Sequence, residues 1–144
     1  MKKIIPLLVL ILIFSVTSLT HAQVQTRLRI IQASNIGKTV DPSLRDLHND
    51  LGTLFSFSSY RLLKDETLSL SLNIPVSFQV HKGRSIEITQ TGLHRNIAEI
   101  RVRIIREGTD ILNTQVRLSP GKTVLIGGPK HGEGVAILAL STRF

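Results

Sequence analysis

The chain has 144 residues, no cysteine, and 18 lysines and arginines against 10 acidic residues. Without cysteine it can form neither a disulfide, nor a thiol nucleophile, nor a lipid-modified N-terminus. The length suits one domain that buries a core without covalent staples, and the positive charge suits anionic partners, although it also serves solubility alone.

The first 22 residues have the features of a secretory signal peptide. Lys2 and Lys3 form a positive start, residues 4–19 are apolar and almost uncharged, and Thr20-His21-Ala22 has the small residues of a cleavage site. A retained membrane anchor is the alternative, because the apolar run approaches the shortest length that spans a bilayer. The polar residues from Gln23 onward favour cleavage. We therefore expect an exported protein, periplasmic or associated with the outer membrane, with no integral span after cleavage and no nucleic-acid partner.

Residues 23–65 are expected to form a strand–helix–strand part. Apolar and polar residues alternate over 24–30, which predicts a half-buried strand. Asp41 and Pro42 mark the start of a helix, because the aspartate can accept free backbone amides and proline has no amide to leave unpaired. A short strand over 60–64 follows. The helix is expected to present one apolar stripe to a sheet, formed by Leu44, Leu47, Leu51 and Leu54.

From residue 66 onward the hydrophobic period is two, with turns every eight to twelve residues. Glu107-Gly108-Thr109-Asp110 is expected to form a hairpin turn. This spacing predicts an antiparallel sandwich or barrel-like sheet. The expected fold class is therefore α+β, mainly antiparallel β, in one compact domain over 23–144. Its strand–helix–strand part (23–65) is followed by a β-sandwich-like sheet (66–144).

The last two strands are expected over residues 122–126 and 135–140, joined by a glycine-rich loop. Glycines leave the backbone of such a loop accessible, and a lysine and a histidine stand among them. The candidate loop contacts for a partner are Gly127, Gly128, Lys130 and His131.

Fragments that imitate catalytic motifs lack the required context. Gly121-Lys122-Thr123 resembles the end of a P-loop, but Val116 stands where the motif needs glycine, and a strand follows. Ser119 and Lys122 have the Ser-x-x-Lys spacing, but the Pro-Gly between them excludes the required helix. Glu133 lies two residues from His131, but one such pair in a glycine-rich loop is weak evidence for a metal site. We expect no catalytic residue, cofactor or metal site, and an enzyme of unrecognised type remains an alternative.

Two predicted strands carry arginine pairs on one face: Arg27 with Arg29, and Arg101 with Arg103. If these strands are neighbours, four guanidinium groups form a patch suited to phosphate or carboxylate. The alternative is a solvated sheet face balanced by nearby glutamates. These four arginines are the candidate site for an anion or a partner.

Aromatic residues gather over 55–60 in a chain that has few of them. Phe57 and Tyr60 can wedge the end of the helix against the following strand, or they can form a platform on which a ligand stacks. They are the candidate aromatic contacts.

The segment GKTVLIGG, residues 121–128, resembles the strand-and-Gly-Gly element near the end of the secretin homology domain of outer-membrane secretion pores. The chain lacks the proline-leucine-glycine signature that follows this element in secretins, and it is too short for both pore and ring domains. As a whole, with Ser59-Tyr60-Arg61-Leu62-Leu63 and Gly127-Gly128-Pro129, the chain resembles a small uncharacterised exported family of Gram-negative bacteria. That resemblance implies export and a compact fold, and it implies no activity.

The sequence thus favours a non-enzymatic protein-binding or assembly module of the cell envelope, with an association to secretion through the local resemblance. Its partner would be another envelope protein, engaged by strand addition at an exposed sheet edge. The alternative is a binding domain for an anionic lipid headgroup or glycan, which would use the arginine face and the glycine-rich loop.

Overall fold

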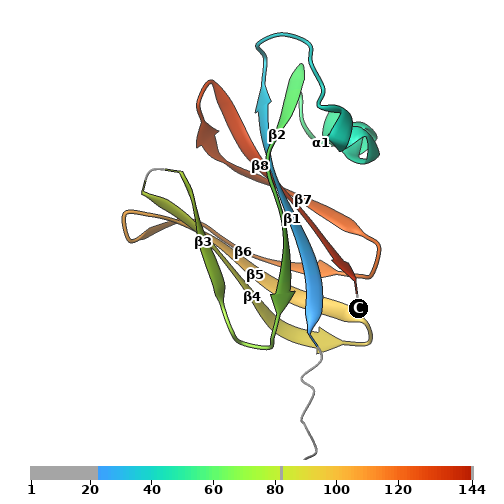
Figure 1. The fold of residues 1–144 in the computed structure, drawn as a ribbon, viewed down its shortest axis with the longest axis vertical. Helices are drawn as coiled ribbons and strands as arrows, with labels where there is room; N and C mark the ends of the chain where they lie inside the picture. Colours follow the sequence, from blue (N-terminus) through green and yellow to red (C-terminus); the bar gives the residue numbers. More distant parts are fainter. Residues whose placement is uncertain (1–22, 82, 144) are drawn as a thin grey trace, which may run out of the picture.

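The computed structural model describes residues 23–143 except Lys82. The predicted signal peptide lies outside the described residues. The described chain forms two four-stranded antiparallel sheets and one short helical segment (Figure 1). This confirms the predicted mainly antiparallel fold with sandwich-like sheets. Within the described part, no helix has the length and apolar character needed to cross a bilayer.

Sheet A joins the two ends of the chain. It contains β1 (Val24–Ser34), β2 (Ser59–Leu70), β7 (Thr123–His131) and β8 (Gly134–Arg143), in the order β2-β1-β8-β7. The C-terminal hairpin therefore completes the sheet that the first strand begins. The division expected after residue 65 falls inside β2, and both parts of the chain contribute to sheet A.

Sheet B follows chain order. It contains β3 (Val76–His81), β4 (Arg84–His94), β5 (Ile97–Arg106) and β6 (Thr109–Leu118). Two-residue turns join β4 to β5 and β5 to β6, and Glu107 and Gly108 in the second turn both have positive φ, 50° and 79°. Turns of this kind match the twist of paired strands, which confirms the hairpin predicted there.

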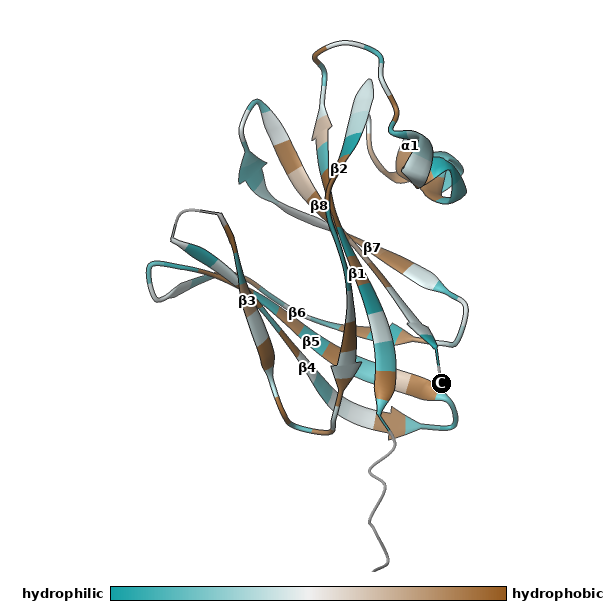
Figure 2. Ribbon diagram, viewed as in Figure 1, coloured by the Kyte–Doolittle hydropathy of each residue, from teal (hydrophilic) through white to brown (hydrophobic). Residues whose placement is uncertain are grey.

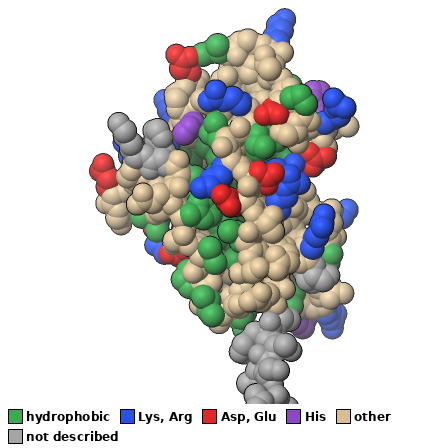
Figure 3. Space-filling view, viewed as in Figure 1, with side chains coloured by type: hydrophobic (Ala, Val, Ile, Leu, Met, Phe, Trp, Pro, Cys, Tyr) green, Lys and Arg blue, Asp and Glu red, His purple; other side chains and the backbone are tan. Residues whose placement is uncertain are grey.

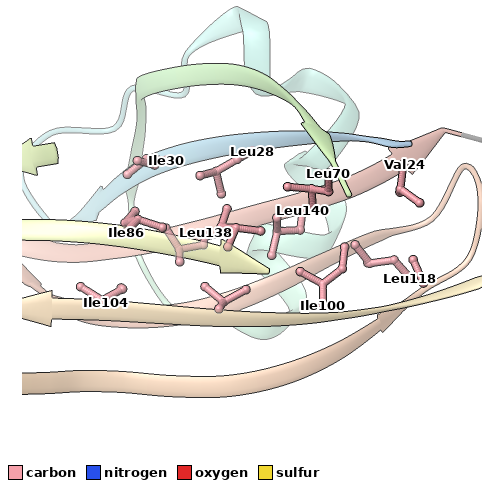
Figure 4. Close-up of a cluster of buried hydrophobic side chains, with 13 residues drawn as sticks. Val24, Leu28, Ile30, Leu70, Ile86, Ile100, Ile104, Leu118, Leu138 and Leu140 are labelled. Carbon is pink, nitrogen blue, oxygen red and sulfur yellow. The ribbon is translucent and has the colours of Figure 1, made fainter. Parts of the chain in front are cut away.

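The main core lies between the two sheets (Figure 4). Because successive side chains of a strand point to opposite faces, every second residue of the central strands faces this core. Leu28, Leu138 and Leu140 of sheet A meet Ile86, Ile100 and Ile104 of sheet B, and all six are buried.

A helical segment covers part of the outer face of sheet A. It begins as a 3-10 helix, η1 (Pro42–Leu47), and continues as α1 (His48–Leu54). The predicted cap is confirmed, because the Ser43 amide donates to Asp41 Oδ1 at 3.0 Å. Three of the predicted stripe leucines are buried, but Leu54 is 63% exposed. The prediction is wrong there because the helix ends at Leu54 and the following residue, Phe55, packs on the sheet instead.

An ion pair of a buried arginine with an exposed aspartate fixes the helical segment to the sheet. The Arg29 side chain of β1 is only 3% exposed. Its two terminal nitrogens donate to the two carboxylate oxygens of Asp46 in η1, at 3.0 and 2.9 Å. A buried guanidinium needs such pairing, because removing the charge from water is costly.

The glycine-rich segment before β8 is strand rather than loop. β7 continues through Gly127 and Gly128 to His131, and only residues 132–133 form the turn. A side chain at Gly128 would lie 2.9 Å from the Ala136 carbonyl oxygen, so glycine here permits close approach of β7 to β8. The predicted loop was wrong because the glycines serve strand contact rather than a turn.

The strands give the sandwich two ends, which we name after their places in Figure 1. At the lower end β1 begins, with Val24 opposite Leu70 of β2 and Gln25 opposite Arg143 of β8. At the upper end β1 stops, with Ser34 opposite Ser59 and Gly134. The eleven residues of β1 separate the two ends by about 30 Å.

Candidate functional site

The two arginine pairs predicted as one patch lie apart. β1 belongs to sheet A and β5 to sheet B, so these strands are not neighbours. Leu28 of β1 and Val102 of β5 both face the core between the sheets. By alternation, Arg27 lies on the outer face of sheet A and Arg103 on the outer face of sheet B. The condition for a four-guanidinium patch is therefore not met.

Carboxylates of the chain itself neutralise most of these arginines. Arg27 pairs with Asp65 at 2.6 Å, which raises the pKa of the arginine and lowers that of the aspartate. Arg103 pairs with Glu87 at 2.9 Å and Asp110 at 2.7 Å, and hydrogen bonds to these carboxylates raise its pKa. Arg29 is buried against the helical segment, as described above. Arg101 is exposed on sheet B.

The predicted loop contacts lie on the edge strand β7, and two of them accept hydrogen bonds from other strands through their backbone carbonyls. The Lys130 carbonyl accepts a hydrogen bond from Arg84 Nη1 of sheet B at 2.9 Å. The His131 carbonyl accepts one from Gln32 Nε2 at 3.1 Å. These residues are not brought together with any of the four predicted arginines.

The predicted aromatic contacts belong to the hydrophobic cluster between the outer face of sheet A and the helical segment. The rings of Phe57 and Tyr60 meet edge to face with centroids 6.5 Å apart. The buried Tyr60 hydroxyl lies 3.2 Å from the carbonyl oxygens of Leu51 and Phe55. The pair therefore fastens the end of α1 to β2, which corresponds to the wedge interpretation.

A groove of about 430 Å³ opens on the outer face of sheet A, toward its lower end. The strand register explains its composition, because Arg27 of β1 stands between Thr67 of β2 and Ser141 of β8. Gln25 and Arg143 stand opposite each other two residues closer to the end. All five lining side chains can donate hydrogen bonds. We call this site the basic groove.

The two arginines of the basic groove differ in their environments. Arg27 uses Nε and Nη2 to bind Asp65, so its Nη1 hydrogens remain for another acceptor. Arg143 is exposed, and no ion pair joins it to a carboxylate of the described residues. Sequence reasoning missed Arg143. The last strand was predicted to end at residue 140, so Arg143 lay outside it, and its neighbours follow only from the pairing of β8 with β1.

A larger pocket of about 650 Å³ lies at the upper end, between the β1–η1 connection, the start of β2 and the β7–β8 turn. Ile36 and Tyr60 contribute apolar surface, and Arg61 and Glu133 contribute charge. Arg61 is held by a hydrogen bond from its Nη2 to Gln32 Oε1, at 2.8 Å. We call this site the upper pocket.

Each edge strand carries a feature that opposes pairing with another chain. The start of β2 is covered by residues 39–41, which exchange backbone hydrogen bonds of 2.9 Å with Tyr60. β3 has only six residues. β6 contains a bulge at Ile111, and β7 contains Pro129 within a register shift. These features limit strand addition where they occur, and strand addition along the rest of the edges stays a prediction.

Among the described residues, no three of the histidine and acidic side chains lie close enough together to hold a metal ion. No protein family, curated protein or solved structure matches the chain. The basic groove and the upper pocket are therefore argued from the geometry of this chain itself.

Proposed function

We propose that the protein is an exported, non-enzymatic binding module of the cell envelope, and that the basic groove holds the anionic group of its ligand. That group is a phosphate or carboxylate, carried by a lipid headgroup or a glycan. The observation that carries the proposal is the convergence of two arginines and three neutral donors in one groove. Export rests on the leader sequence and on the family resemblance.

The groove is suited to an anion because part of it is held in place before binding. Asp65 fixes the Arg27 guanidinium through two bonds of 2.9 and 2.6 Å. A fixed guanidinium loses less conformational entropy when a ligand binds, and its planar donors match the oxygens of phosphate and carboxylate. Arg143 adds a positive charge without a described carboxylate partner. Both arginines are exposed, so we expect binding to weaken as salt screens them.

Arg143→Gln tests the groove with little risk to the fold, because Arg143 is exposed at the end of β8. The matched control is Arg101→Gln, an exposed strand arginine on the opposite outer face. We expect Arg143→Gln to weaken binding by about tenfold, the effect of losing one charge-assisted hydrogen bond, and Arg101→Gln to leave it unchanged. Isothermal titration with glycerol phosphate and with a glucuronate-containing oligosaccharide separates lipid-type from glycan-type ligands. The proposal would be overturned if Arg143→Gln bound each probe as tightly as the control Arg101→Gln does.

A second candidate function, binding of another envelope protein, is favoured by the upper pocket. Its volume is that of a specific binding pocket, and Ile36 at its wall is 59% exposed. An association with secretion would rest on residues 121–128, which lie at the start of β7 and just before it.

Affinity capture from envelope extract at low and high salt tests this second candidate. We expect a stoichiometric partner that survives high salt with the natural chain and is lost with Ile36→Asp. Ile111→Asp, an exposed change on β6, should keep the partner. Retention by both variants would remove the upper pocket from consideration.

A further inference from the structure

Four exposed aliphatic side chains gather at the lower end of the sandwich. Leu72 and Ile74 belong to the β2–β3 connection and are 54% and 59% exposed. Leu93 and Ile97 belong to the β4–β5 hairpin and are 42% and 38% exposed. A backbone bridge between Leu72 and Gln90 of β4 places the connection beside the hairpin. Figure 3 shows apolar side chains exposed toward this end of the molecule, and Figure 2 shows the corresponding hydrophobic segments.

The lower end is also basic. Its strand ends and connections contain a single acidic residue, Glu99, which pairs with Arg117 at 3.5 Å. In the view of Figure 3, no acidic side chain among the coloured residues shows at the lowest part of the molecule. The segments of this end are residues 24–27, 67–75, 88–99, 116–123 and 140–143. Of their basic residues, Arg27 pairs with Asp65 just beyond these segments and Arg117 pairs with Glu99, which leaves Arg95, Lys122 and Arg143 as the positive excess.

We infer that the lower end docks on an anionic membrane surface. The four aliphatic side chains enter the boundary between headgroups and acyl chains, and the basic side chains around them contact lipid phosphates. This inference rests on the proposed function, because the basic groove supplies one of the headgroup sites. It adds the source of the ligand, which is lipid, and the apolar contacts that a free headgroup does not offer.

The course of the chain favours a membrane over a protein as the occupant. Only residues 20–23 separate the apolar run that ends at Leu19 from Val24, the first strand residue. Such a connection spans at most about 18 Å. The lower end is therefore tethered close to a segment whose composition suits a bilayer, either during export or as a retained anchor. The same end combines aliphatic side chains with an excess of positive charge, which is the chemistry of an interfacial surface.

Vesicle co-sedimentation tests the docking. Residues 23–144 are used, because both hydrophobic clusters lie within the described strands and helical segment. The probes are vesicles of phosphatidylethanolamine with phosphatidylglycerol, and vesicles of phosphatidylcholine alone. We expect at least about tenfold tighter binding to the anionic vesicles at low salt, since each basic side chain near an anionic surface adds attraction.

Paired variants separate the apolar and the charged contributions. Leu72→Ser with Ile74→Ser should reduce vesicle binding about tenfold, since two aliphatic side chains no longer leave water. Leu54→Ser with Ile111→Ser, exposed residues away from the lower end, should leave it unchanged. Arg95→Gln with Lys122→Gln should flatten the salt dependence, and Lys38→Gln with Arg106→Gln should preserve it. Circular dichroism confirms that each variant is folded.

The outcomes distinguish this inference from the proposed function. Equal binding by the lower-end variants and their controls, or a stable dimer that the Leu72 and Ile74 changes dissolve, would overturn membrane docking. In either case, the proposed function would stand if the natural chain still binds glycerol phosphate and Arg143→Gln binds it about tenfold more weakly. Loss of vesicle binding with the Leu72 and Ile74 changes, together with full binding by Arg143→Gln, would support docking and reject the groove.

Discussion

The two halves of the outer face of sheet A show how one sheet can present different chemistry at its two ends. Toward the upper end, Ile31, Ala33 and Ile137 are buried beneath the helical segment. Toward the lower end the same strands present Arg27 and Ser141 to a groove. The pairing of strands is continuous across both halves. The helical cover therefore decides which half contributes to the core and which is available for binding.

The largest expected effect on stability comes from weakening the packing of the helical segment on sheet A. Leu51 of α1 is fully buried, and Leu51→Ala removes its packing against sheet A. We expect a loss of about 2 to 5 kcal/mol in the free energy of unfolding, measured by urea denaturation. Leu54→Ala, three residues further on and 63% exposed, should change it by less than about 0.5 kcal/mol. Comparable losses in both variants would contradict the burial of only one face of α1.

A smaller loss of stability is expected from removing the ion pair between the helical segment and sheet A. Asp46→Ala leaves the Arg29 guanidinium buried without its carboxylate. Because Asp46 itself is more than half exposed, water can reach part of the site, and we expect a loss of about 1 to 3 kcal/mol. Arg29→Met removes the charge as well and should cost less than Asp46→Ala. The reverse order in thermal or urea unfolding would show that the pair itself, rather than the unpaired charge, determines the effect.

Acid titration compares the two halves through their aspartates. Hydrogen bonds from Arg29 and Arg27 lower the pKa values of Asp46 and Asp65 in the folded protein. The folded pKa then lies below the unfolded value of about 3.9. The stabilisation is therefore complete above the unfolded pKa and is lost as the pH falls through the folded pKa. We expect the stability difference between natural chain and Asp46→Asn to shrink below about pH 4. A difference that stays constant to lower pH would exclude ionisation of Asp46 as its cause.

Local signals in the sequence predicted much of the fold. The alternation of apolar residues predicted most strands, Asp41 predicted the helix start, and Glu107-Gly108 predicted a hairpin. Each of these signals depends on residues a few positions apart, so it can be recognised in the sequence without knowledge of the fold. The packing of the helical segment on a sheet through its leucines was also predicted, apart from Leu54 at its end.

The pairing of strands that lie far apart in the sequence explains why the candidate site could not be predicted. Arg27 and Arg143 are 116 positions apart, and only the pairing of β1 with β8 brings them to one groove. The same pairing leaves Arg101 and Arg103 on the other sheet. Gly127 and Gly128 predicted a loop by composition, whereas the structure uses Gly128 for close contact with β8. Strand order therefore decides the candidate site, and strand order is the feature that periodicity does not encode.

The smallest expected effect concerns the interior of the lower end. Thr26 and Thr142 face each other across β1 and β8, both are buried, and the Oγ1 atoms of both lack a hydrogen-bond partner among the described residues. Valine has nearly the same shape without the hydroxyl, so Thr142→Val should raise the free energy of unfolding by about 1 kcal/mol. Both hydroxyls lie on the core face, opposite to the basic groove, so anion titration should be unchanged in this variant. A lower melting temperature for Thr142→Val would mean that its hydroxyl is satisfied, and the lower end would then be polar inside as well as outside.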